Sequence, residues 1–144
     1  MMKTYVWGLI LCLYTVMITG SIPVQAQDLR DRIGNKTGSV SSDGTVRNRI
    51  GNSIGRIDSN GNIRNRVGNS VGRIDSDGVF RDRIGNSIGR IDKDGRVRDR
   101  IGNSIGRVDD DGTIRDRIGN SVGSARGVPK AWAAAIFFFE FFEE

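Results

Sequence analysis

Residues 97–113 read VRDRIGNSIGRVDDDGT, and this unit recurs along most of the chain. The period can be followed in the glycine after each Arg-Ile or Arg-Val pair, which recurs every 17 positions without slippage. These glycines are Gly34, Gly51, Gly68, Gly85, Gly102 and Gly119. A constant period of this kind predicts a repeat architecture. The first of the six copies is degenerate and the sixth breaks off after Gly123, as terminal capping units do.

The N-terminal 26 residues are predicted to be a secretory signal peptide. A basic start at Lys3 precedes an apolar run, and Val24-Gln25-Ala26 resembles a cleavage site. The apolar run is short for a transmembrane helix, and the residue before Cys12 is not the small one of a lipoprotein signal. We therefore expect a secreted, periplasmic or cell-envelope protein whose mature chain has no transmembrane span. Residues 27–126 would then be the repeat domain and residues 127–144 an apolar tail.

The composition of the mature chain argues against an enzyme. Cys12 is the only cysteine and falls in the leader, the chain has no histidine, and no glutamate precedes Glu140. Neither a Ser-based triad nor a phosphate loop is present. We predict a non-enzyme without a cofactor. Loss of the leader lowers the formal net charge from +5 to +4, and nearly all the positive charge is arginine at fixed phases of the repeat.

Each repeat is predicted to form strands and tight turns. Its apolar residues do not follow a helical period, and glycine, asparagine and aspartate are frequent. A three-residue loop, Ser59-Asn60-Gly61, places Ile57 opposite Ile63. The same chemistry recurs at Asp43-Gly44, Asp77-Gly78, Asp94-Gly95 and Asp111-Gly112, which gives five hairpin tips.

Extending this register divides the strands into two faces. The thinly apolar face holds Gly55, Ile57, Ile63, Asn65 and Val67, and the charged face holds Ile54, Arg56, Asp58, Arg64 and Arg66. Gly51-Asn52 and its equivalents suit a reversal or corner between successive hairpins.

The predicted fold class is all-β, with six 17-residue repeats forming five short hairpins arranged radially in a closed ring. Closure removes exposed strand edges, and the first strand, Leu29 to Ile33, could meet the last, Ser121 to Gly123, to seal the ring. An open β-solenoid is the alternative.

The repeats also resemble a known family. Residues 83–95 read RIGNSIGRIDKDG, and residues 100–112 nearly repeat them. They resemble the short repeats of secreted bacterial proteins described as five-fold β-flowers, over about residues 28–126. The resemblance implies a radial arrangement of five hairpins and implies no activity.

The tail differs abruptly from the repeats. Pro129 suits a first helical turn and the following alanines favour helix, so we expect a short helix, although residues 136–142 also fit an extended conformation. So large an apolar segment must be buried, either inside the ring or between chains. The second option predicts a homo-oligomer. Its predicted assembly residues are Trp132, Ile136, Phe137, Phe138, Phe139, Phe141 and Phe142.

Two motifs in the repeats could bind ligands. The Asp-x-Asp-Gly sequences resemble the start of a calcium loop but lack its late glutamate, so we predict turn residues and no metal. The arginines would form circles of positive charge that could hold an anionic polysaccharide, unless aspartates pair with them. The candidates are Arg73, Arg81, Arg83, Arg90, Arg98, Arg100 and Arg107. Nucleic acid is disfavoured, because Phe80 is the only aromatic residue in the repeats.

Two functions follow from the sequence. The first is a non-catalytic, exported structural or assembly protein of the cell envelope or surface that self-associates through its tail. The alternative is an adhesin-like binding module that recognises an anionic ligand or glycan through its repeated arginines.

Overall fold

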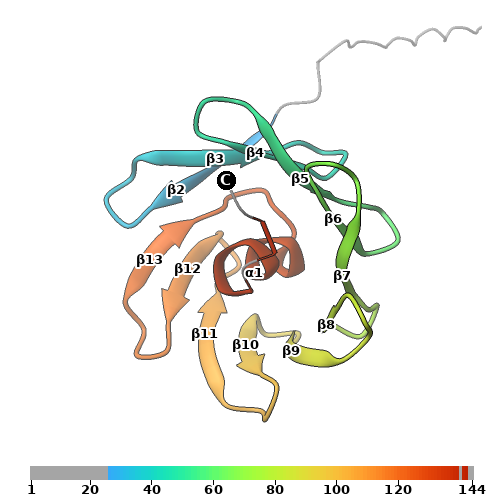
Figure 1. The fold of residues 1–144 in the computed structure, drawn as a ribbon. Coiled ribbons are helices and arrows are strands. Elements are labelled where there is room, and N and C mark those ends of the chain that lie inside the picture. The colour runs from blue at the N-terminus through green and yellow to red at the C-terminus, as the bar shows by residue number, and fades with distance from the viewer. Residues whose placement is uncertain (1–25, 140, 143–144) are drawn as a thin grey trace, which may run out of the picture.

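The computed structural model describes residues 26–139 together with 141–142. The predicted signal peptide therefore lies, except for Ala26, outside the described residues. Over the described part, twelve strands surround one helix, as Figure 1 shows. The elements are β2 Gln27–Asp31, β3 Lys36–Val40, β4 Thr45–Asn48, β5 Ser53–Ile57, β6 Asn62–Asn65, β7 Ser70–Ile74, β8 Val79–Asp82, β9 Ser87–Ile91, β10 Arg96–Asp99, β11 Ser104–Val108, β12 Thr113–Asp116, β13 Ser121–Ser124 and α1 Lys130–Phe138.

The strands form a closed antiparallel ring. Each strand pairs with its neighbours along the chain, and β13 pairs with β2 through Gly123 opposite Asp31 and Ser124 opposite Arg30. The predicted closure between the first and last strands is thus confirmed, and the sheet is not an open solenoid. The ring encloses α1 (Figure 1).

Two kinds of turn alternate around the ring. The predicted Asp-Gly turns are present, and Ile57 lies opposite Ile63 as expected. The second reversal, at Gly51-Asn52 and its equivalents, also joins adjacent antiparallel strands and closes a hairpin. Counted at these second turns, the described chain has six hairpins. Five turns link them, four with Asp-Gly and one with Asn60-Gly61, and all five are called Asp-Gly turns below. The loops between β10 and β11 and between β12 and β13 point away from α1 (Figure 1).

The Asp-Gly turns tie each hairpin to the next. The Gly44 carbonyl accepts a hydrogen bond of 2.9 Å from the amide of Ile57, and the next two turns repeat this bond from Ile74 and Ile91. Gly44 has φ +92°, and a side chain there would collide with the Ile57 carbonyl. Glycine is therefore required twice over, for its backbone conformation and for the close approach of the next strand.

A β-bulge interrupts every hairpin. In the hairpin of β4 and β5, Val46 lies opposite Gly55 but Arg47 lies opposite Ser53, so that Ile54 is the extra residue. Bulges increase strand twist and bend the sheet, which helps such short strands curve into a ring.

The core fills the middle of the ring. Ile57, Ile63 and Phe80 are fully buried on the inner face of the strands, and Ala133–135 of α1 are fully buried against them. Val67, expected on the apolar face, lies instead in a turn and is 75% exposed. No helix in the described part is long and apolar enough to cross a membrane.

Candidate functional site

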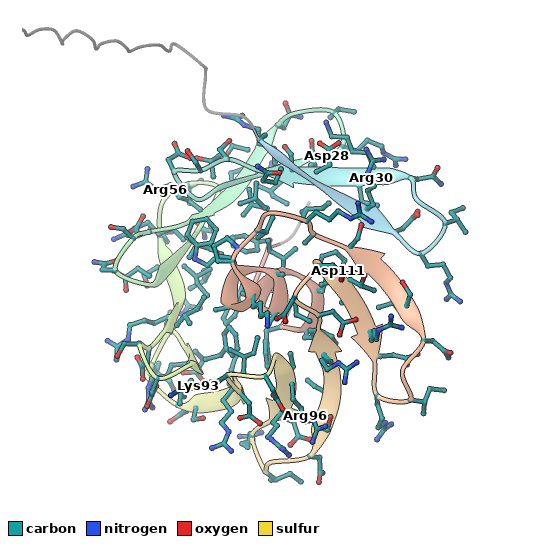
Figure 2. All side chains as sticks on the ribbon, turned by 180° about the vertical axis from the view of Figure 1, so that it is seen from behind. Asp28, Arg30, Arg56, Lys93, Arg96 and Asp111 are labelled. Atoms are coloured by element: carbon teal, nitrogen blue, oxygen red, sulfur yellow. The ribbon has the colours of Figure 1, made fainter. Side chains whose placement is uncertain are left out.

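Arginine and aspartate side chains form a ladder on the outer face of the ring. Asp58 accepts hydrogen bonds from Nε of Arg56 at 2.9 Å and from Nε of Arg64 at 2.8 Å. Arg56 points away from the central helix (Figure 2). In each of the following repeats, one aspartate likewise forms ion pairs with two arginines. Asp75 pairs with Arg73 and Arg81, Asp92 with Arg90 and Arg98, and Asp109 with Arg107 and Arg115.

The hydrogen bonds from arginine lower the pKa values of the ladder aspartates. The hydrogen bond from Arg81 holds the pKa of Asp75 below its usual value of 3.8, with a further contribution from Arg73. Asp58, Asp92 and Asp109 have lowered pKa values for the same reason. The ladder aspartates are therefore ionised at neutral pH and their charge is matched by arginine.

The ladder is also connected to the exposed hairpin turns. Arg64 donates from Nη1 to the carbonyl of Gly68 at 3.0 Å, and Arg81 donates to the carbonyl of Gly85 at 2.9 Å. Each of these arginines thus holds both a ladder aspartate and a turn backbone, which fixes its guanidinium group.

The turn itself is organised by its first residue. Asp82 Oδ1 accepts from the amide of Ile84 at 3.1 Å and from the amide of Asn86 at 2.9 Å. Gly85 follows with φ +99°, a conformation that favours glycine. The side chains of Arg83 and Ile84 take no part in these bonds and are exposed.

The six turns of this kind form what we call the hairpin rim. The rim arginines are Arg32, Arg49, Arg66, Arg83, Arg100 and Arg117. Within the described residues, none of them makes an ion pair. Beside each arginine lies a side chain that is 75–80% exposed, namely Ile33, Ile50, Val67, Ile84, Ile101 or Ile118.

Neighbouring hairpins bring rim and ladder arginines together in shallow hollows. One hollow is lined by Arg73, Arg81, Arg83 and Ile84, besides backbone and small polar residues. A second hollow has the same construction, with Arg107, Arg115, Arg117 and Ile118.

A family model described as "5-fold beta-flower protein" matches residues 26–142. The chain belongs to the 5-fold β-flower family. The resemblance seen in the repeats is thereby confirmed, and the radial ring of hairpins agrees with the description. No curated protein and no solved structure matches the chain. The β-flower description names a fold and no activity, so a function has to be argued from the surface.

The predicted ligand-binding arginines of this β-flower fall into two groups. Arg83 and Arg100 lie on the hairpin rim and make no ion pair with another described residue. The other five, Arg73, Arg81, Arg90, Arg98 and Arg107, are paired within the ladder. Sequence reasoning missed the remaining rim arginines and the rim isoleucines. The available signal was a β-branched residue inside a turn, where such residues are unusual.

The Asp-Gly turns of the β-flower use their carboxylates locally. Asp43 and Asp111 accept hydrogen bonds from the amides two residues ahead, and the bonds from Thr45 and Thr113 lower their pKa values. Asp43 and Asp111 therefore stabilise their own turns, as predicted for turn residues. In the part of the chain that the structure describes, no three His, Cys, Asp or Glu residues are grouped to hold a metal ion.

The predicted assembly residues lie inside the β-flower ring. Each tail phenylalanine lies over a glycine of a different strand, so closely that a β-carbon on that glycine would collide with its ring. The pairs are Phe137 with Gly123, Phe138 with Gly106, Phe139 with Gly89, Phe141 with Gly72 and Phe142 with Gly55. Phe139 also contacts Phe80, with ring centroids 4.5 Å apart. Trp132 and Ile136 are partly buried and pack against the same core.

The helix prediction for the tail is confirmed as far as Phe138. Beyond it the chain leaves the helix, so that Phe141 and Phe142 reach strands β7 and β5. The tail therefore contacts successive repeats in reverse order along the chain. The described side chains of the tail thus pack inside the ring of their own chain. Assembly of several chains through the tail stays a prediction.

Proposed function

We propose that this β-flower is a non-catalytic binding module that holds an anionic partner on its hairpin rim. The observation that supports it most strongly is the division of the arginines. The ladder arginines are paired with aspartates, whereas the rim arginines are not paired within the described residues. A repeated, exposed and unmatched positive charge is suited to attracting an anionic ligand.

The geometry also supports multivalent binding. The rim repeats the same arginine with every hairpin, so that an extended anion could contact several turns at once. The turn backbone is fixed by Asp82 and its equivalents, and this pre-organisation lowers the entropy cost of binding.

The non-catalytic part of the proposal rests on the state of the ionisable groups. A general acid or base works best when its pKa lies near the operating pH. The ladder aspartates shift the other way, to lower pKa values, and neither histidine nor cysteine follows Cys12 in the sequence.

Two variants of equal charge test the proposal. The rim variant carries Arg66→Gln, Arg83→Gln and Arg100→Gln, and the ladder variant carries Arg56→Gln, Arg73→Gln and Arg90→Gln. Heparin serves as the anionic probe in titration calorimetry at low salt. We expect the rim variant to bind at least about tenfold more weakly than the unmodified protein, and the ladder variant to lose much less. Equal losses in both variants would mean that only net charge matters, and the rim would not be the site.

A second candidate is the exported assembly protein that self-associates through its tail. One observation favours it: the five tail phenylalanines are only partly buried within one chain, which leaves apolar surface that another chain could cover. Sedimentation equilibrium of the chain from residue 27 onward, with and without Phe138→Ser and Phe141→Ser, tests it. A larger species that dissociates while the protein stays folded supports this candidate, and a monomer in both cases contradicts it.

A further inference from the structure

The hairpin rim is apolar as well as basic. Among the described residues, the six Ile and Val side chains of the rim are large hydrophobic side chains that are 75–80% exposed to solvent. Each one lies directly beside a rim arginine. Single exposed apolar residues are common on soluble proteins, but an isoleucine or valine at the same position of every hairpin is a repeated surface feature.

Folding does not account for these side chains. The turn is held by Asp82 or its equivalent, by the positive φ of Gly85, and by the backbone of Asn86. None of these bonds involves the side chain of Ile84, which is 79% exposed. Turns usually carry Gly, Asn, Asp, Ser or Pro, because these residues suit their backbone geometry and solvent exposure. An exposed isoleucine therefore serves something other than the turn.

The six rim turns lie at the same end of the strands, the end that points away from α1 in the hairpins of β10–β11 and β12–β13 (Figure 1). In a closed antiparallel sheet, successive turns alternate between the two ends of the strands. The Asp-Gly turns occupy one end, so the rim turns that alternate with them along the described chain occupy the other. Neighbouring hairpins meet at this end in the hollows described above, so a partner there would contact arginines and isoleucines of adjacent hairpins together.

The chemistry of the rim selects among the candidate partners. A second copy meeting the rim face to face would bring rim arginines close to rim arginines, which is unfavourable. A soluble polyanion would use the arginines but leave the isoleucines in water. A bilayer surface with anionic headgroups offers negative charge for the arginines and an apolar layer just below for the isoleucines.

We infer that the hairpin rim docks on the surface of a bilayer that contains anionic lipids. This inference rests on the proposed function, because it names the anionic partner of the same rim. The arginines contact the headgroups, and the neighbouring Ile and Val side chains enter the region between headgroups and acyl chains.

The test uses vesicle co-sedimentation with three proteins. They are the unmodified chain, the rim arginine variant described above, and an apolar variant with Val67→Ser, Ile84→Ser and Ile101→Ser. One set of vesicles is phosphatidylcholine alone, and the other contains about one third phosphatidylglycerol. Heparin binding and the melting temperature are measured on each protein in parallel, so that a folding defect is recognised.

We expect the unmodified chain to bind the phosphatidylglycerol vesicles and not the phosphatidylcholine ones. The apolar variant should lose at least about tenfold in vesicle binding while it keeps its heparin affinity and melting temperature. If the apolar variant binds the vesicles as well as the unmodified chain, or if the unmodified chain binds heparin but no vesicles, the bilayer inference is wrong and the proposed function stands. If the rim arginine variant keeps full binding to both probes, the proposed function fails too.

Discussion

Phe139 lies over Gly89, and a β-carbon on Gly89 would be 2.6 Å from the Phe139 ring and 2.5 Å from the carbonyl oxygen of Arg98. Real β-carbons do not approach other atoms so closely. Because Arg98 contributes backbone, only the glycine leaves room for both neighbours. The glycine of the strand and the phenylalanine of the tail are therefore required together.

This contact predicts a large effect of Gly89→Ala. The added methyl group overpacks the ring and should lower the free energy of unfolding by about 1–3 kcal/mol, measured by urea denaturation. Gly85→Ala is the matched control, because Gly85 has φ +99° and nothing within 4 Å of an added β-carbon. It should show only the smaller cost of backbone strain, about 1 kcal/mol. Similar losses at both positions would contradict close packing of the tail.

The tail is also expected to be necessary for stability. Phe138→Ser with Phe141→Ser removes two rings from Gly106 and Gly72, so the melting temperature should fall markedly. Burial of one such side chain contributes up to about 1.5–3 kcal/mol. Ile84→Ser with Ile101→Ser is the control, since both side chains are about four-fifths exposed, and it should leave the melting temperature almost unchanged. A double phenylalanine variant that melts like the unmodified chain would show that the tail is dispensable.

The ion-pair ladder predicts a dependence of stability on acid pH. The pKa values of Asp58, Asp75, Asp92 and Asp109 are lower in the folded chain than the usual 3.8. A carboxylate with a depressed pKa contributes fully to stability when the pH is above its pKa in the unfolded chain. This contribution is lost as the pH falls through its pKa in the folded chain. Stability should therefore decline as the pH drops below about 3.8. In a variant with Asp75→Asn, Asp92→Asn and Asp109→Asn, the melting temperature should change less between neutral and acid pH than in the unmodified chain. If the melting temperatures of the two proteins fall in parallel, the ladder is not the source of the acid dependence.

The closing pair of strands should protect the ring from aggregation. Deletion of residues 27–31 removes β2 and leaves the edges of β3 and β13 unpaired. We expect light scattering to rise on concentration of this variant. The control is a circular permutant opened between Gly51 and Asn52, where the chain is exposed. The permutant should fold and stay monodisperse, and a deletion variant that behaves equally well would count against the importance of closure.

The repeat made much of this fold predictable. Turn glycines mark the reversals, and the loop length around Gly61 fixes Ile57 opposite Ile63, because register in a hairpin follows from its turn. Closure could be argued from the half-repeats at both ends. The bulge at Ile54 could not be read from the sequence, since the extra residue is defined only by its partner strand.

The surface was predictable in kind but not in detail. Arginines at fixed phases suggested circles of charge, yet pairing depends on the cross-strand position that places Arg56 and Arg64 on either side of Asp58. The alternating pattern also assigned Val67 to the apolar face, because it treated the turn as continued strand. The tail contacts depend on how α1 enters the ring, which no local pattern reports.

Mapping of amide chemical shifts during a heparin titration tests the proposed binding surface most directly. We expect the resonances of the rim-turn amides, such as those of Arg83, Ile84 and Arg100, to shift together and to saturate with one affinity. The resonances of the Asp-Gly turn amides at the opposite end should not shift. Shifts centred on the Asp-Gly turns, or spread evenly over the ladder with the rim unaffected, would contradict this expectation.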